Sequence, residues 1–168
     1  MTGEPSESLQ RALELGCAYL NSRERTVSEV RSQLRRKGAA EALIDACLRT
    51  LVDQGLLDDA RFSEMYVADK RQLEQWGSER IRRGLIARGI EPQRAAAAVS
   101  AADSAPTGDA DTDGGHGELG RALALLARRF PSPPSDRRER ERALGLLLRK
   151  GYESELAFDA LSAYARGD

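Results

Sequence analysis

Residues that build reaction centres are scarce in this sequence. Its 168 residues include one histidine, His116, which stands between glycines, and two cysteines, Cys17 and Cys47. Both cysteines fall within apolar helical patterns, where a reduced thiol behaves as a small hydrophobe, so neither a disulfide nor a metal pair is expected. Phosphate-binding glycine loops, C-x-x-C, H-E-x-x-H and nucleophile elbows are all missing. We therefore expect no catalytic residues, no bound metal, no cofactor and no enzymatic activity.

Long apolar runs are missing as well. No stretch approaches the roughly 20 apolar residues that span a bilayer, and the opening MTGEPSESLQ resembles no signal peptide. A cytoplasmic protein without membrane contact is expected. Aromatic residues make up only 5% of the chain, and its apolar fraction depends mainly on Ala and Leu, which favours helices over strands. The sequence thus predicts an all-α protein.

One pattern occurs three times, each time around a glycine: Gly38, Gly89 and Gly151, called here the repeat glycines. Apolar residues stand eight and four positions before each glycine, and six, ten and thirteen positions after it. The preceding pairs are Val30 and Leu34, Ile81 and Leu85, and Ala143 and Leu147; the following sets are Ile44, Leu48 and Leu51, Ala95, Val99 and Ala102, and Ala157, Leu161 and Tyr164. Such spacings place side chains on one helix face. Since glycine adopts the left-handed geometry that ends many helices, each segment is predicted as helix, tight turn, helix.

Local signals mark where several of these helices begin and end. Thr26 and Glu29 form a T-x-x-E capping box, and Pro92 suits the first turn of a helix. Gly55 is predicted to stop a helix, with Leu56 making the usual hydrophobic contact back onto it. These signals agree with the helices that the apolar spacing predicts.

Aspartates are expected at two further helix starts. The pair Asp58 and Asp59 could bind a cation, but N-capping accounts for Asp58 without a further assumption and is preferred. After the Pro-rich break PSPPSD, Asp136 and Glu139 are expected to cap the helix that resumes.

A further helical pattern precedes each glycine-centred pair, which gives three helices per unit. The predicted units are 1–57, 58–102 and 118–168, and residues 103–117, with four aspartates and few apolar residues, are predicted as an acidic flexible linker. Units this small bury too little surface to be very stable alone, so neighbours should share interfaces. We predict tandem three-helix repeats, similar to helix-turn-helix units, in an elongated, curved array.

Basic residues cluster before all three repeat glycines, and those before Gly151 are Arg140, Arg142, Arg149 and Lys150. Six basic and two acidic residues lie between Asn21 and Gly38, a local charge of +4 on a chain whose net charge is −1. Such a patch attracts a phosphate backbone or an acidic protein surface. The candidate partner-binding residues are Arg23, Arg25, Arg31, Arg35, Arg36 and Lys37 in the first unit, and Arg80, Arg82, Arg83 and Arg88 in the second.

Simpler explanations exist for some of these cations. Lys37, Arg88 and Lys150 end their helices, where a cation stabilises the helix dipole by about 0.3–1 kcal/mol without any partner. The others also suit a solvated helix face, so both interpretations stay open for them.

Three segments resemble the RecX family of recombination regulators: LNSRERTVSEVRSQLRRKG from Leu20, LDDARFS from Leu57 and GSERIRRGLIARGI from Gly77. RALGLLLRKGY from Arg142 is similar to the third repeat of that family. The resemblance implies tandem three-helix repeats and a protein that lies along the groove of the RecA filament on DNA. It also implies restraint of the filament's ATP hydrolysis, strand exchange and co-protease activity.

Two other functions remain open at this stage. A helix-turn-helix protein acting on free DNA would also have three helices and a glycine turn per unit, although a near-neutral charge disfavours strong duplex affinity. A passive helical scaffold is the third class. The expected partner is the RecA filament, with direct DNA contact left open and a monomer as the expected state.

Overall fold

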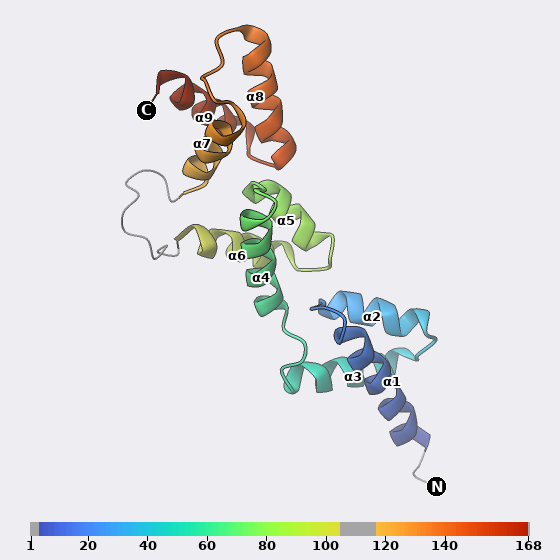
Figure 1. Cartoon of the computed structure of the whole chain (residues 1–168). Coiled ribbons are helices and arrows are strands. Elements are labelled where there is room, and N and C mark those ends of the chain that lie inside the picture. The colour runs from blue at the N-terminus through green and yellow to red at the C-terminus, as the bar shows by residue number, and fades with distance from the viewer. Residues whose placement is uncertain (1–3, 105–116, 168) are drawn as a thin grey trace.

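The computed structural model describes residues 4–104 and 117–167, and it confirms the all-α prediction (Figure 1). Nine helices and no strand occur within these residues. Repeat 1 comprises α1 (Glu4–Leu20), α2 (Val27–Arg36) and α3 (Glu41–Asp53); repeat 2 comprises α4 (Asp59–Gln72), α5 (Ser78–Ile86) and α6 (Pro92–Ser104); repeat 3 comprises α7 (Glu118–Arg129), α8 (Arg137–Lys150) and α9 (Ser154–Arg166). Across the part of the chain described, none of the helices is long and apolar enough to cross a membrane.

Each repeat has its own hydrophobic core. The apolar residues predicted four and eight positions before the repeat glycines are all fully buried. The stripes after the glycines are buried too, except that Tyr164 is partly buried and Ala102 is exposed. At that turn of α6 the inward side is taken by Asp103, whose carboxylate pairs with Arg71 of α4 at 2.8 Å. Asp103, assigned from the sequence to the linker, therefore belongs to the packed end of α6.

The repeat glycines adopt the predicted left-handed geometry, with φ of +80°, +83° and +88° for Gly38, Gly89 and Gly151. The capping box at Thr26 is confirmed, as are the Asp58 and Asp136 caps and Pro92 as the first residue of α6.

The contact predicted for Leu56 is wrong. Leu56 is 44% exposed, whereas Leu57 is 1% exposed and packs in the core of repeat 1. The backbone N–H groups of both leucines donate to the carbonyl oxygen of Leu51. The turn at Gly55 thus carries the chain one residue further before a side chain enters the core.

The repeats join head to tail through hydrogen bonds at equivalent positions. The hydroxyl of Thr26, just before α2, donates to the carbonyl oxygen of Arg88 at 2.7 Å. One repeat further on, the N–H of Gly77, just before α5, donates to the carbonyl oxygen of Lys150 at 2.8 Å. Arg88 and Lys150 directly precede repeat glycines, so the end of α8 meets the start of α5, and the end of α5 meets the start of α2. This joining produces the elongated array in Figure 1.

Repeat 3 makes further contacts with repeat 2. The backbone N–H of Ser78 donates to Glu118 at 2.7 Å, and Lys150 Nζ donates to the carbonyl oxygen of Glu74 at 2.7 Å. Asp103 accepts from Arg71 and also from Arg121 of α7, at 2.8 and 2.7 Å. The prediction of a flexible linker falls largely on 105–116, which lie outside the described residues.

Candidate partner-binding surface

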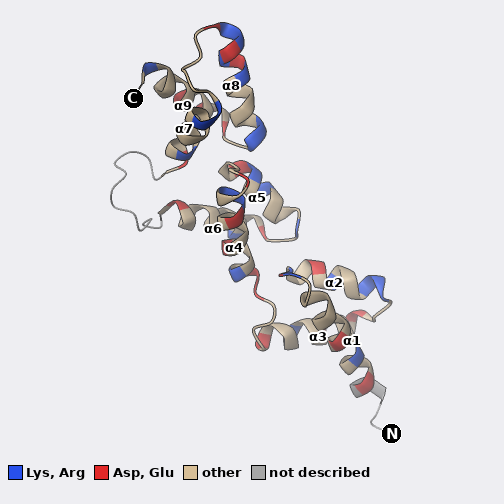
Figure 2. Cartoon of the chain, in the orientation of Figure 1, with Lys and Arg blue, Asp and Glu red and all other residues tan. Residues whose placement is uncertain are grey.

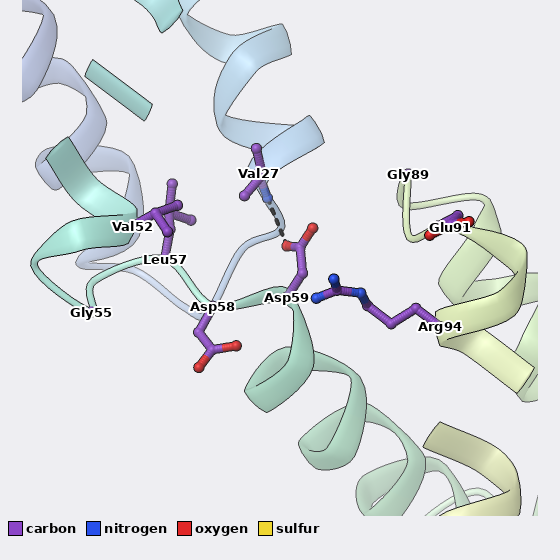
Figure 3. Close-up of a pocket in the computed structure, with 9 residues that line it drawn as sticks. All are labelled: Val27, Val52, Gly55, Leu57, Asp58, Asp59, Gly89, Glu91 and Arg94. Atoms are coloured by element: carbon purple, nitrogen blue, oxygen red, sulfur yellow. Dashed lines mark hydrogen bonds between the residues drawn. The ribbon is translucent and has the colours of Figure 1, made fainter. Parts of the chain in front are cut away.

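The junction of repeats 1 and 2 holds two cavities whose linings differ in charge. The first, of about 530 Å³, lies beside the Asp58 turn and carries three carboxylates and one guanidinium, from Asp58, Asp59, Glu91 and Arg94 (Figure 3). Asp59 accepts a hydrogen bond from the backbone N–H of Val27 at 2.9 Å, and Arg94 extends toward Asp59. Asp59 therefore ties the start of α2 to the start of α4.

Asp58 acts as a helix cap. Its carboxylate accepts from the backbone N–H groups of Arg61 and Ala60, and these bonds hold its pKa below the usual value. Residues 4–104 and 117–167 contain no cluster of three or more His, Cys, Asp or Glu side chains that could hold a metal ion. His116 lies outside these residues.

The second cavity, of about 380 Å³, is the Arg36–Arg88 pocket. Its lining residues are Tyr19, Ser28, Glu29, Ser32, Arg36, Ala87 and Arg88. Ser28, Ser32 and Arg36 lie at intervals of four along α2, so they share one helix face. Arg88 lines the same cavity from the turn after α5. Its guanidinium donates within repeat 2, to Tyr66 Oη at 3.2 Å and to the carbonyl oxygen of Gly84 at 3.1 Å, and lies 4.8 Å from the Tyr66 ring centre. Arginines from two different repeats and two serines thus line one cavity, a combination that suits a carboxylate or a phosphate.

Arg23 and Arg25 lie at the edge of the Arg36–Arg88 pocket. Arg25 stacks its guanidinium 4.1 Å from the ring centre of Tyr19, which lines the pocket. Arg23 lies 3.7 Å from the carboxylate of Glu29, another lining residue. These two arginines enlarge the basic region without entering the cavity.

Arg31 and Arg35 are neutralised within repeat 1. Arg31 pairs with Glu41 at 3.3 Å and with Asp45 at 2.7 Å, and Arg35 also bonds to Glu41. The hydrogen bond from Arg35 is the main cause that lowers the pKa of Glu41, and the same bond raises the pKa of Arg35. Their charge is therefore matched by α3, and they contribute little net positive field.

Arg36 and Lys37 differ from that pair. Within residues 4–104 and 117–167 neither makes an ion pair, and Arg36 donates only to Gln33 of its own helix. Both side chains are exposed at the end of α2, where Figure 2 shows a basic tip. Unlike Arg31 and Arg35, these two candidates keep their charge available to a partner.

The candidates of repeat 2 divide in a similar way. Arg82 and Arg83 both pair with Glu79 of the same helix. Arg80 instead serves the junction with repeat 3, because it stacks 4.1 Å from the ring centre of Trp76 and donates to the carbonyl oxygen of Arg149 at 2.8 Å. Arg88, in contrast, shares a cavity with Arg36, a candidate from repeat 1.

The sequence interpretation missed Tyr19, Ser28 and Ser32 as members of this site. A signal was present, because Ser28 and Ser32 precede Arg36 by eight and four positions on one face of α2. The approach of Arg88 carried no such signal, since it depends on how two repeats pack.

Comparison with known protein families finds three matches along the chain. Residues 12–51, 58–99 and 117–161 match the first, second and third three-helix domains of RecX. Two curated relatives are named Regulatory protein RecX. The one from Trichlorobacter lovleyi is 32% identical over 161 residues, 93% of this chain and 96% of the relative. The one from Leptothrix cholodnii is 31% identical over 161 residues, covering 95% and 91%.

Solved structures show the same fold. A crystal structure of RecX from Lactobacillus salivarius superposes with a TM-score of 0.78 and 22% identity, over 97% of this chain and 99% of that chain. A crystal structure titled regulatory protein RecX superposes with a TM-score of 0.71 and 20% identity, covering 97% and 73%. The succession of three-helix units is therefore shared with these structures.

Proposed function

Because the chain belongs to the RecX family, we propose that it binds the RecA filament on DNA and restrains the filament's ATPase, strand-exchange and co-protease activities in recombination, DNA repair and the SOS response. The relatives are named regulatory proteins, which supports a regulatory role over a catalytic one. We propose that it acts in the cytoplasm as a monomer, with the three repeats, predicted from the sequence at 1–57, 58–102 and 118–168, as its binding units.

The array offers a physical route to regulation. Three units in line bridge several protomers of a filament, so weak contacts add through effective concentration. A filament that changes pitch when it hydrolyses ATP presents these units with two different spacings. A ligand that fits one spacing better shifts the equilibrium by its difference in affinity. The protein would thereby act as a clamp that selects one filament conformation.

The observation that carries the binding proposal is the convergence of Arg36 and Arg88 across the junction of repeats 1 and 2. We propose that this pocket receives a carboxylate of the filament protein. Glu29 also lines the pocket, and this negative charge disfavours a phosphate backbone more than a single carboxylate. Lys37, Arg23 and Arg25 would add to the attraction from the rim. Arg31, Arg35, Arg80, Arg82 and Arg83 would contribute hydrogen-bond donors while keeping their internal partners.

Helix-turn-helix binding to free DNA has less support. In that mode the helix after the turn enters the major groove of DNA. This helix then lies between two phosphate backbones, which attract a basic helix and repel an acidic one. The charged residues of the third helices are Glu41, Asp45, Arg49 and Asp53 in α3, Arg94 and Asp103 in α6, and Glu155, Asp159 and Arg166 in α9. None of the three helices has a net positive charge: α3 and α9 are negative and would repel phosphates, and α6 is neutral and would not attract them.

A titration separates the three classes of function. Fluorescently labelled protein is added to RecA-coated single-stranded DNA, to bare single-stranded DNA and to bare duplex, over a salt series. The filament regulator binds the coated DNA far more tightly than either bare form. Tight binding to bare duplex with a steep salt slope would instead support the DNA-binding alternative, and a passive scaffold would bind none of the three.

Charge reversal tests the pocket itself. Arg36→Glu should weaken filament binding by about tenfold or more, because it places a carboxylate where the partner's carboxylate docks. Arg11→Glu makes the same change in net charge on an exposed site two turns from Tyr19 in α1, and should have little effect. Equal losses in the two variants would mean that only net charge matters and would reject the pocket.

A further inference from the structure

Repeats 1 and 3 each carry a groove between their second and third helices, but the two grooves differ in chemistry. The α8–α9 groove, of about 490 Å³, is lined by Arg137, Arg140, Glu141, Leu144, Phe158, Leu161, Ser162 and Ala165. The groove of repeat 1, of about 420 Å³, is lined by Val27, Arg31, Asp45, Leu48, Arg49, Val52 and Asp53. Because the repeats are equivalent, the residues of the two grooves can be compared position by position.

The decisive positions lie seven residues before and seven after the repeat glycine. In repeat 1 these are Arg31 and Asp45, which form an ion pair of 2.7 Å across the groove. In repeat 3 they are Leu144 and Phe158. An ion pair that spans one groove is thus replaced by two large apolar side chains in the other.

Phe158 is not needed by the core of repeat 3. Its side chain is 54% exposed, and it is absent from the apolar residues that pack against that core, whereas Leu144 is among them. Phe158 instead lines the hollow together with Leu144 and Leu161, and an apolar patch rimmed by polar residues is typical of an interaction site. The floor of the groove continues from Leu144 through Leu161, which is almost fully buried.

The rim of the α8–α9 groove is basic. Of the charged residues that line it, Arg137 and Arg140 are cationic and only Glu141 is anionic. Glu141 pairs with Arg137 at 2.8 Å, while Arg140 is exposed and makes no ion pair within the described residues. The residues Arg137–Arg142 contain four arginines and two glutamates, and no carboxylate of α9 lines the groove.

We propose that the α8–α9 groove docks an acidic segment of a partner protein. An aliphatic or aromatic side chain of that segment inserts between Leu144 and Phe158, and its carboxylates pair with Arg140 and Arg137. Charge complementarity favours an acidic segment, and the apolar floor favours a protein side chain over a phosphate backbone. This docking requires only the groove, whichever protein supplies the segment.

The test uses the full chain and three labelled probes. One is a synthetic amphipathic peptide with Phe and Leu on one helical face and Glu on the other; the second has Lys in place of every Glu; the third is oligo(dT). Fluorescence anisotropy gives the affinities. The acidic peptide should bind at least about tenfold more tightly than the lysine peptide. Equal peptide affinities, or tighter binding of oligo(dT), would overturn the proposal.

The variant Leu144→Arg/Phe158→Asp places the pair of repeat 1 into repeat 3, so its fold is expected to be retained and is checked by circular dichroism. It should lose at least about tenfold in affinity for the acidic peptide. Leu148→Asp changes an exposed leucine of α8 that does not line the groove, and should bind normally. Arg140→Glu should reduce the preference for the acidic peptide.

Sedimentation of the same proteins distinguishes a second copy of the chain as the occupant. A monomer is expected for both the unmodified chain and Leu144→Arg/Phe158→Asp. A dimer that dissociates in this variant would show that the groove binds itself, and the acidic-segment proposal would be wrong.

Discussion

Thr26 and Arg88, 62 residues apart, are joined by a hydrogen bond of 2.7 Å from the threonine hydroxyl to the arginine carbonyl oxygen. The same hydroxyl oxygen accepts from the backbone N–H of Glu29 at 3.1 Å. One fully buried oxygen therefore begins α2 and also satisfies the end of α5 in the next repeat. Local capping and repeat joining depend on the same side chain.

Substitution at Thr26 should separate these roles from simple packing. Thr26→Val keeps the shape but removes both hydrogen bonds, and should lower the free energy of unfolding by about 1–3 kcal/mol. Thr26→Ser keeps the hydroxyl and should lose less. Urea unfolding gives both values, and equal losses in the two variants would contradict the role of the hydroxyl.

The three repeat glycines share one backbone geometry but not one environment. A Cβ atom at Gly89 would overlap the side chain of Ser28, and one at Gly151 would overlap Arg80, whereas nothing lies within 4 Å of that position at Gly38. Gly38→Ala should therefore cost only the strain of left-handed alanine, about 1–2 kcal/mol. Gly89→Ala and Gly151→Ala should also loosen their junctions.

Small-angle scattering and limited proteolysis measure the loosening. The Gly38→Ala protein should keep the length distribution of the unmodified chain. The two junction variants should show a broader distribution and faster cleavage between repeats. Identical behaviour of all three would mean that the junctions do not depend on these close approaches.

Asp103 links three helices through two arginines. Arg71 has a side chain only 9% exposed, burial lowers its pKa, and Asp103 offsets part of this effect. Asp103→Asn should leave Arg71 poorly compensated and lower the free energy of unfolding by roughly 1–3 kcal/mol. Ser104→Ala, at the exposed neighbouring position, is the matched control. A similar small loss in both proteins would show that the pairing contributes little.

What the sequence predicted correctly was local. Gly38 and its two equivalents, the Thr26 capping box and the Asp58 cap depend on residues within one turn of each other, so spacing alone was sufficient. The turn at Gly55 shows the limit, since whether Leu56 or Leu57 enters the core depends on the direction of the next helix.

The candidate site depended on longer contacts. Charge counting treated Arg31 and Arg35 as a free patch because Glu41 and Asp45 lie on another helix, across the Gly38 turn. The packing of α2 against α3 cancels those charges. Arg88 joins Arg36 only because one repeat stacks on the next, a relationship that spacing within a unit cannot show.

Acid should destabilise the array partly through Asp58. Bonds from the N–H groups of Arg61 and Ala60 lower its pKa in the folded protein, so its contribution to stability is complete above the unfolded pKa and is lost as pH falls through the folded value. The loss should begin below about pH 4, near the usual pKa of an aspartate.

Asn accepts similar capping bonds without titrating in this range. Asp58→Asn should therefore match the unmodified chain near neutral pH and show a flatter profile in urea unfolding between neutral and acidic pH. Parallel profiles would mean that the cap does not contribute to the acid sensitivity.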